Sequence, residues 1–363
     1  GLNCDTGEID PAALPADLTV TFGFPKRGHF AFPGAGLVGK LLIAEIGIAP
    51  RFVKDCHLHL VTSQMVADRL PARPLDAHKG TFGRALIVAG SVNYTGAPAL
   101  AALAATRVGV GLVTLALAKS VFPIVAGKLL EPTYLLLPES LGIISSEATG
   151  ILNDQVGNYQ ALLIGPGLGR DRELTRFIEE FLLDQGKAGS KRRIGFVAGG
   201  RGGDAGPHVG RAGLPPLVID ADALNALSDL DEWWKGLPPG GILTPHPGEM
   251  ARLMRCDPQE IQRDRLGAAA RAAAKWNQIV LLKGAHTVIA SPDGETYVLP
   301  FANPTLATAG TGDVLAGAIV GLLAQGLVPL DAAIVGAFLH GLAAEEVEYS
   351  KNMSCGAVAG DLI

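Results

Sequence analysis

The sequence predicts an α/β protein with a mostly parallel central sheet and helices on both of its faces. From residue 79 onward, short and almost wholly apolar runs alternate with longer segments that carry helix-like patterns. Strands that are apolar on both sides are typical of parallel sheets whose two faces are covered by helices. Such sheets bind ligands in the loops beyond the carboxyl ends of their strands. Candidate site residues are therefore expected in those loops.

Composition excludes several classes of protein. The chain has 363 residues, 48% of them hydrophobic, and 30 Lys and Arg against 35 Asp and Glu give a formal net charge of −5. This balance predicts no general attraction to nucleic acid or to an anionic membrane. No apolar run reaches the ~20 residues that a membrane-spanning helix needs. The four cysteines form no CxxC pair, which disfavours a disulfide framework or a cysteine-based zinc site and favours a cytoplasmic protein.

The chain divides into three regions. Residues 1–55 are rich in turns, and their apolar stretches Val20–Phe24 and Leu41–Ile48 predict strands. Residues 56–77 mix charges with prolines and predict a connector with one short helix. The connector opens with Cys-His-Leu-His, which resembles a metal-binding tract but has no carboxylate-rich partner there, so we do not interpret it as a metal site. Residues 78–363 predict one large α/β domain.

Each element of the large domain follows from its local pattern. Short apolar runs predict strands at Ala85–Ala89, Leu112–Leu117, Tyr134–Leu137, Ala161–Ile164, Leu217–Ile219 and Ile279–Leu282. Longer segments predict helices at Ala97–Val108, Arg172–Leu183, Pro258–Trp276, Val314–Gln325 and Asp331–Tyr349. Residues 186–216 interrupt this alternation with a basic, glycine-rich insert. Such an insert could contact RNA or a phosphate-bearing ligand, but we favour a solvent-exposed loop.

The strongest motif is ATAGTGD, residues 307–313, which leads directly into an apolar helix. Small residues let the backbone amides of Gly310, Thr311 and Gly312 crowd together where the helix dipole is positive, which makes an anion site. Asp313 would then lie beside a bound phosphate, where its carboxylate could accept a proton from an attacking hydroxyl. Taken alone, a glycine turn with an acidic first helical turn explains the motif equally well.

Two further motifs follow predicted strands. ILTPHPGE, residues 242–249, holds His246 at a strand end. A lone histidine is more often structural than functional, and an HxxE pair without a third ligand is a poor metal site. VLLKGAHTVI, residues 280–289, predicts two strands that meet at a tight turn at Lys283 and Gly284. Lys283 could face a phosphate there, and the alternative is an ordinary hairpin with an exposed lysine.

Loops after two more strands carry glycines and acids. IGPGLG, residues 164–169, is a glycine-rich loop directly after a predicted strand. VIDADALN, residues 218–225, places acids at another strand end, where Asp220 or Asn225 could position a phosphate or Mg²⁺. No Walker A sequence, GxSxG motif or credible dinucleotide fingerprint occurs in the chain.

The ordered set of motifs resembles the ADP/ATP-dependent NAD(P)H-hydrate dehydratases, a family with the ribokinase-like fold. The resemblance covers residues 78–363 and includes HKGTFGRALIVAGS, YTGAPALAA and RVGVGLV besides the motifs above. Residues 1–55 resemble the last part of an NAD(P)H-hydrate epimerase domain, whose catalytic acid and metal-binding loop would lie upstream of Gly1. We therefore expect no epimerase activity from this chain, and we expect a homo-oligomer.

The resemblance implies a reaction and a set of site residues. The substrates would be the hydrates of NADH and NADPH (NADHX and NADPHX) with ADP or ATP, and Mg²⁺ would bridge the phosphates. Asp313 would be the catalytic base, and the amides of Gly310, Thr311 and Gly312 would stabilise the transferred phosphoryl group. Hydrate-binding positions match Ala97, Gly167, His246 and Asp313. Nucleotide-binding positions match Lys283, Gly284, Ala285, His286, Thr287 and Gly312.

Two other functions stay open at this stage. A kinase of the same fold that phosphorylates a small vitamin-precursor alcohol would share the GTGD motif but should lack the TPHPGE and KGAHT pair. A catalytically silent nucleotide-binding protein would not need Asp313 within an intact GTGD. Both alternatives are therefore less favoured, although fold analogy alone decides no function.

Overall fold

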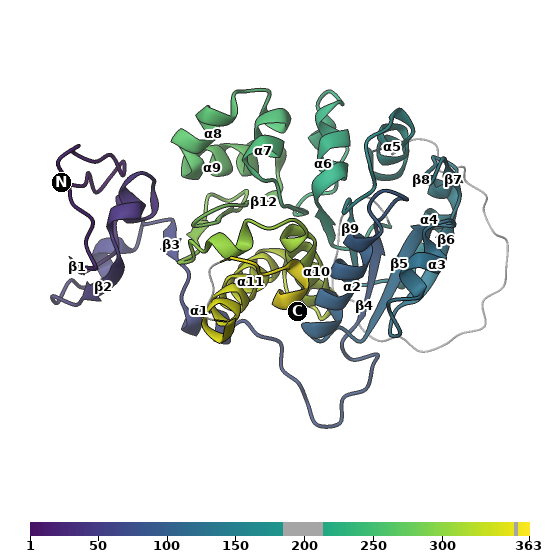
Figure 1. Cartoon of the computed structure of the whole chain (residues 1–363), viewed down its shortest axis with the longest axis horizontal. Coiled ribbons are helices and arrows are strands. Elements are labelled where there is room, and N and C mark those ends of the chain that lie inside the picture. Colours follow the sequence, from purple (N-terminus) through teal and green to yellow (C-terminus); the bar gives the residue numbers. More distant parts are fainter. Residues whose placement is uncertain (184–212, 352–354) are drawn as a thin grey trace.

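The computed structural model describes residues 1–183, 213–351 and 355–363 of the chain. Its centre is a ten-stranded sheet with the strand order β3-β14-β13-β12-β11-β10-β9-β4-β5-β6 (Figure 1). Seven of the nine neighbouring pairs in this sheet are parallel, and only the pairs on either side of β13 are antiparallel. The predicted α/β class with a mostly parallel sheet is confirmed.

Six strands of the sheet lie within one residue of the continuous apolar runs that predict them, whereas the strands at residues 58–60 and 296–298 were not predicted. Every residue of the strands Ala161–Ile164 (β9) and Ile279–Leu282 (β12) is buried, because helices cover both faces. The other strands of this sheet are Leu58–Leu60 (β3), Arg84–Val88 (β4), Leu112–Ala118 (β5), Thr133–Leu137 (β6), Leu217–Ile219 (β10), Ile242–Leu243 (β11), Val288–Ala290 (β13) and Thr296–Val298 (β14). A small antiparallel pair, Glu139–Ser140 (β7) and Ile143–Ile144 (β8), follows β6.

Helices form the two outer layers. Those from α5 to α9 lie on one side of the sheet, and α2, α10 and α11 lie on the other (Figure 1). Their bounds are Ser63–Ala67 (α1), Gly96–Arg107 (α2), Phe122–Ala126 (α3), Ala148–Gln155 (α4), Arg172–Ile178 (α5), Ala221–Ser228 (α6), Pro247–Met254 (α7), Pro258–Arg263 (α8), Arg265–Trp276 (α9), Thr311–Ala324 (α10) and Pro329–Lys351 (α11). None of the helices in the described part of the chain is long and apolar enough to span a membrane.

Close packing of α2 against α10 positions one wall of the site. Gly317 lies in the middle of α10, and a Cβ atom added there would come within 2.2 Å of the Ala101 carbonyl oxygen on α2. Glycine therefore lets the two backbones approach each other. This contact brings together the first turns of the two helices, which carry Ala97 and Asp313.

Two of the predicted helices differ from those in the structure. The helix expected over Pro258–Trp276 is divided into α8 and α9, because Asp264 leaves the helical conformation and its carboxylate accepts the Gly267 amide to cap α9. The expected helix Arg172–Leu183 ends as α5 at Ile178 and continues as the π-helical turn Glu179–Leu183. Most of the basic insert at 186–216 lies outside the described residues.

The connection between β12 and β13 is also different from the expected tight turn. It spans the five residues 283–287, which we call the KGAHT loop. The loop is held open because the Lys283 amide donates to Pro245 and the His286 amide donates to Phe301, both outside the hairpin.

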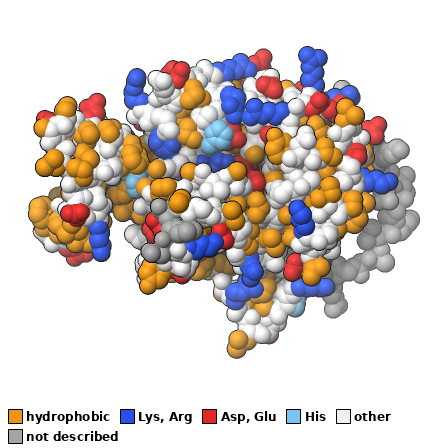
Figure 2. All heavy atoms as spheres, viewed as in Figure 1, with side chains coloured by type: hydrophobic (Ala, Val, Ile, Leu, Met, Phe, Trp, Pro, Cys, Tyr) orange, Lys and Arg blue, Asp and Glu red, His pale blue; other side chains and the backbone are white. Residues whose placement is uncertain are grey.

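The N-terminal region forms a separate lobe at one end of the sheet (Figure 1). Its strands Leu18–Phe22 (β1) and Lys40–Ala44 (β2) pair in parallel. Hydrophobic side chains cover much of this lobe (Figure 2), and Phe22 is 61% exposed. The predicted strands are thus present, each shifted toward the N-terminus.

The connector does more than link two regions, because its residues 58–60 become the edge strand β3. The connector histidines also have a carboxylate partner that is distant in the sequence. His57 Nδ1 and His59 Nε2 each lie 2.6 Å from one oxygen of Glu295. The Glu295 carboxylate raises the pKa of His57. The two histidines and the glutamate form a hydrogen-bonded clasp between the start of the sheet edge at β3 and the loop before β14.

Candidate active site

The candidate site lies where the parallel strands β4, β9, β10, β11 and β12 end. The loops after these strands begin at Ala89, Gly165, Asp220, Thr244 and Lys283. Because the strands are parallel and adjacent, their carboxyl ends share one edge of the sheet. Charged side chains of both signs gather with a histidine around the hollowed centre of the face shown in Figure 2.

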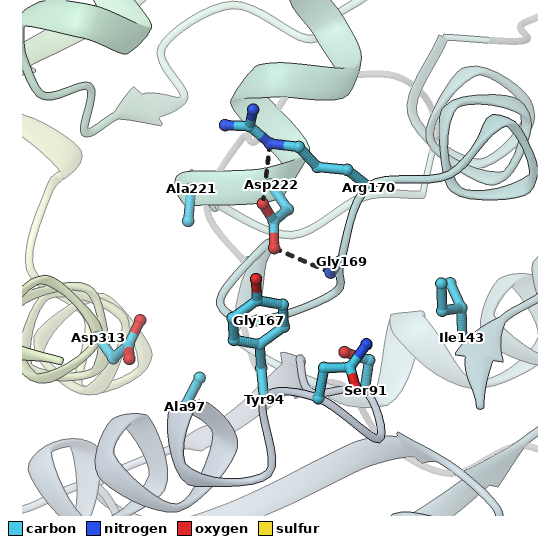
Figure 3. A pocket seen from close by; sticks show the side chains of 11 residues that line it. Ser91, Tyr94, Ala97, Ile143, Gly167, Gly169, Arg170, Ala221, Asp222 and Asp313 are labelled. Atoms are coloured by element: carbon cyan, nitrogen blue, oxygen red, sulfur yellow. Dashed lines mark hydrogen bonds and ion pairs between the residues drawn. The ribbon is translucent and has the colours of Figure 1, made fainter. Parts of the chain in front are cut away.

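A cavity of about 580 Å³ opens at this edge. Asp313 enters from α10 on one side, and Arg170 enters from the loop between β9 and α5 across from it (Figure 3). Ala97 and Gly167 lie between them on the cavity wall. A Cβ atom added to Gly167, whose φ is +63°, would come within 2.8 Å of the Cβ atoms of Ala97 and Tyr94. Glycine is therefore needed there to leave room for the wall.

The start of α10 presents free backbone amides. Among the described residues, the amides of Gly310, Gly312 and Asp313 have no hydrogen-bond acceptor, whereas the Thr311 amide donates to Thr308. The Thr311 hydroxyl also turns away from the cavity and donates to the carbonyl oxygens of Leu306 and Thr308. The amides available for an anion are therefore those on either side of Thr311.

Asp313 has the electrostatic character expected of a proton acceptor. Burial raises the pKa of its carboxyl group to about 7, and the negative charge of Asp220 adds to this effect while Lys283 opposes it. A carboxyl group with this pKa can both hold and release a proton near neutral pH.

A buried ion pair lies beneath the helix start. Asp220 is 1% exposed, and one of its carboxylate oxygens accepts hydrogen bonds from Lys283 Nζ and Thr244 Oγ1, each at 2.8 Å. Lys283 Nζ also lies 3.9 Å from Glu249. Burial disfavours the ammonium, but the carboxylates of Asp220 and Glu249 outweigh it and raise the pKa of Lys283. A Cβ atom on Gly312 would lie 3.4 Å from this ammonium, so the lysine and the free amides border the same space.

His246 and Glu249 form the start of α7. His246 caps the helix, because its Nδ1 accepts from the amide of Gly248 at 3.0 Å, and its own amide donates to Glu249 at 2.8 Å. Burial, Lys283 and Arg252 lower the pKa of His246 to about 4, so the ring is neutral at pH 7. Burial raises the pKa of Glu249 to about 7.

Arg265, which precedes the KGAHT loop by 18 positions, fixes the backbone at the start of this loop. Arg265 Nη2 donates to the carbonyl oxygens of Leu282 and Lys283, at 3.1 and 3.2 Å. Burial lowers the pKa of this guanidinium to about 10. The sequence did not indicate this role of Arg265, because a helical pattern does not show which arginine side chain turns inward.

The N-terminal lobe also contacts the KGAHT loop. The ring of Phe30 meets the His286 ring edge to face at 5.2 Å between centroids, and the Phe32 ring stacks on it at 6.3 Å. Burial lowers the pKa of His286. No local pattern in residues 1–55 indicates this contact.

The structure gathers most of the sequence-predicted residues at one edge. Ala97, Gly167 and Asp313 line the cavity, but His246 is not part of its lining. Asn225 does not line the cavity itself, but its side chain forms a hydrogen bond with Asp222, which does. The side-chain oxygen of Asn225 also accepts from Arg252 Nε at 3.0 Å. The other lining residues had no role predicted from the sequence, and the polar ones among them include Ser91, Tyr94, Arg170 and Asp222. Of these four, all but Arg170 lie within quoted motifs.

No group of three or more His, Cys, Asp or Glu side chains suited to a metal ion occurs within residues 1–183, 213–351 and 355–363. The carboxylates near the free amides are Asp220, Glu249 and Asp313, and the first two already face Lys283. Such a set suits Mg²⁺ that is held chiefly by the phosphates of a ligand, because Mg²⁺ keeps several waters and needs only one or two carboxylates.

The fold and the site together define the class of protein. The chain is similar in structure to a ribokinase-like superfamily protein from Enterococcus faecalis V583, with a TM-score of 0.65, 23% identity, and coverage of 85% of this chain and 93% of that one. This likeness places the fold among the ribokinase-like folds, as the sequence predicted.

The family model described as NAD(P)H-hydrate dehydratase matches residues 85–186 and 208–362, and the chain belongs to this family. The resemblance stated from the motifs is thereby confirmed. A crystal structure of the ADP/ATP-dependent NAD(P)H-hydrate dehydratase of Bacillus subtilis, co-crystallised with ATP and Mg²⁺, is similar over 84% of this chain and 94% of that chain, with a TM-score of 0.65 and 29% identity.

Two curated relatives differ in how much of the chain they match. The bifunctional NAD(P)H-hydrate repair enzyme Nnr of Moorella thermoacetica is 42% identical over all of this chain, which spans 64% of that relative's length. The ADP-dependent (S)-NAD(P)H-hydrate dehydratase of Neisseria meningitidis is 37% identical over 80% of this chain and 86% of its own length. The N-terminal lobe is therefore matched by the bifunctional relative.

Proposed function

We propose that this chain repairs hydrated NADH and NADPH by a nucleotide-dependent dehydration. The observation that carries the proposal is the juxtaposition of Asp313, whose pKa is about 7, with the free amides of Gly310 and Gly312 at the edge of a cavity. The co-substrate is ADP or ATP, bound along the KGAHT loop and the start of α10. Residues 1–55 are the end of an epimerase-type domain, and residues 56–77 connect it to the dehydratase domain at 78–363.

The residues present suit a transfer followed by an elimination. Asp313 takes the proton of the ring hydroxyl while the hydroxyl oxygen of the substrate attacks the terminal phosphoryl group. The nucleotide then leaves with one phosphate fewer. The amides of Gly310 and Gly312 and the ammonium of Lys283 oppose the negative charge on the phosphoryl oxygens. Mg²⁺ bound to the phosphates would supply further neutralisation of charge. The ring nitrogen then expels the phosphate, the adjacent ring carbon loses a proton, and the ring is restored to NADH or NADPH.

Phosphorylation makes the elimination possible because hydroxide is a poor leaving group and phosphate is a good one. The neutral ring of His246 caps α7 next to this centre. An uncharged imidazole there can donate a hydrogen bond to the substrate without adding positive charge. This is the binding role that we propose for His246, which lies beside the cavity lining and not in it.

The test is the recovery of absorbance at 340 nm when the chain is mixed with hydrated NADH or NADPH, Mg²⁺ and either nucleotide. We expect recovery that requires the nucleotide and releases phosphate in equal amount. Folded protein that recovers no cofactor with ADP or ATP would contradict the proposal. A kinase of a small vitamin-precursor alcohol would instead consume ATP only with that alcohol, and a silent binder would consume none. The homo-oligomer and the cytoplasmic location stay predictions.

The pH dependence of this activity should report Asp313. The base must be ionised, so kcat/KM should fall as the pH drops below about 7, the pKa that burial imposes on Asp313. Glu249 titrates in the same range, so a variant must show which of the two groups sets the midpoint. The charge of Asp222 helps to raise the pKa of Asp313 but is not among the causes that shift the pKa of Glu249. Asp222→Asn should therefore move the acidic midpoint to lower pH. A midpoint near 4 in the unmodified chain would contradict the assignment.

A further inference from the structure

Arg170 lines the same cavity as Asp313, from a different wall (Figure 3). It directly follows the glycine-rich loop after β9, and its side chain lines the cavity while remaining 64% exposed. Asp313 lies across the cavity on α10 (Figure 3). A ligand that reacts at Asp313 and extends through the cavity can therefore reach Arg170.

The guanidinium is oriented but keeps its donors free. Its one ionic partner within the described residues is Asp222, whose Oδ1 lies 3.8 Å from Arg170 Nε, beyond hydrogen-bond distance (Figure 3). Asp222 is itself fixed, because its other oxygen accepts the Gly169 amide at 2.9 Å. A planar guanidinium with five donors matches the oxygens of a phosphate, and here the donors have no hydrogen-bond acceptor in the described chain.

The lining of the cavity also suits an extended polar ligand. The Ser91 hydroxyl lines the cavity, is buried, and has no hydrogen-bond partner among the residues that the structure describes. Buried polar groups are normally hydrogen-bonded, so this hydroxyl is available to a ligand. The Tyr94 ring, 55% exposed, supplies a flat apolar surface in the same cavity.

We propose that Arg170 anchors a phosphate of the dinucleotide substrate, with Asp222 as the residue that positions it. This inference rests on the proposed function and adds to it the part of the substrate that is recognised far from the reacting ring. Asp222 alone would repel a phosphate, and Arg170 offsets that repulsion. The phosphate belongs either to the pyrophosphate, which both hydrates share, or to the 2′-phosphate that only NADPHX carries.

The test measures binding of NADH and NADPH, the repaired products, through their own fluorescence and without nucleotide. Arg170→Ala should weaken binding on the order of tenfold, the loss typical of one charge-assisted hydrogen bond. Equal losses for the two cofactors identify the pyrophosphate, and a loss confined to NADPH identifies the 2′-phosphate. Arg170→Lys should restore part of the affinity, because it keeps the charge but not the planar fork.

Arg176→Ala is the matched control. Arg176 on α5 is also 64% exposed, pairs with Glu180 in the π-helical turn that follows α5, and does not line the cavity. Its removal should therefore leave both affinities unchanged. Arg170→Ala protein that binds both cofactors within twofold of the unmodified chain would overturn the inference. The 340 nm assay on the unmodified chain decides the proposed function separately, because cofactor binding through Arg170 does not require turnover.

Discussion

Asp313→Asn is expected to lower turnover by a factor on the order of 10²–10⁴, the range for losing general-base help. Asparagine is nearly isosteric with aspartate, and the free amides of Gly310 and Gly312 remain in place, so the fold and nucleotide binding should persist. The affinity for ADP should hold or rise, because a negative charge near the phosphates is removed. Turnover is measured at 340 nm and ADP affinity by calorimetry.

The same variant should be more stable than the unmodified chain at high pH. The folded protein raises the pKa of Asp313 from 3.8 to about 7, so the folded state binds this proton more tightly than the unfolded state does. The resulting cost to stability is absent below pH 4 and complete above pH 7. Thermal unfolding should therefore show a higher Tm for Asp313→Asn at pH 8 and a smaller difference at pH 4.

Asp229→Asn serves as the control for both measurements. Asp229 is exposed at the end of α6 and does not line the cavity, so its replacement should change neither turnover nor Tm appreciably. Near-normal turnover in Asp313→Asn would remove the assigned role of the carboxylate. The acidic residue would then be only a favourable charge at a helix start.

Lys283→Met is expected to destabilise the chain by about 3–5 kcal/mol, the cost of leaving a buried charge unpaired. Asp220, which is 1% exposed, would keep only the Thr244 hydroxyl as a side-chain hydrogen-bond partner within the described part of the chain. Nucleotide affinity should also fall, because the lost ammonium borders Gly312 at the start of α10. Urea unfolding measures the first effect, and ADP calorimetry measures the second.

A second variant separates the two effects. Combining Lys283→Met with Asp220→Asn removes both charges, so most of the stability should return while the weak nucleotide binding remains. The control is Lys235→Met, which breaks the exposed pair with Glu232 and should cost at most about 1 kcal/mol. If Lys283→Met bound ADP normally, the lysine would be a structural partner of Asp220 and nothing more.

The motifs located the site because each of them follows a buried strand. A continuous apolar run such as Ala161–Ile164 or Ile279–Leu282 can be buried on both faces only in a sheet covered on both sides. Parallel strands then bring their following loops to one edge, so Gly167, Asp220 and Lys283 meet there although they are distant in the sequence. This inference needs strand positions but no side-chain detail.

The partners of those residues were not predictable in the same way. Nothing local pairs Lys283 with Asp220, 63 positions away, or places Arg265 beneath the KGAHT loop. The connector histidines appeared to lack a carboxylate because Glu295 reaches them only when β3 joins the sheet. The expected tight turn at Lys283 and Gly284 was wrong for the same reason, since the acceptors that hold the loop open lie in other segments.

The sequence by itself determined the fold class, the family and the edge of the sheet where the site lies. These depend on the periodicity and order of residues, which are local properties of the chain. Only the tertiary structure decided that the Asp313 pKa rises to about 7 and that the Thr311 amide is already bonded while its neighbours are free. The same holds for Arg170, which faces Asp313 across the cavity. The physical reason is that pKa values, free donors and cavity walls depend on burial and on the distances between segments, which are set only when helices and sheet pack together.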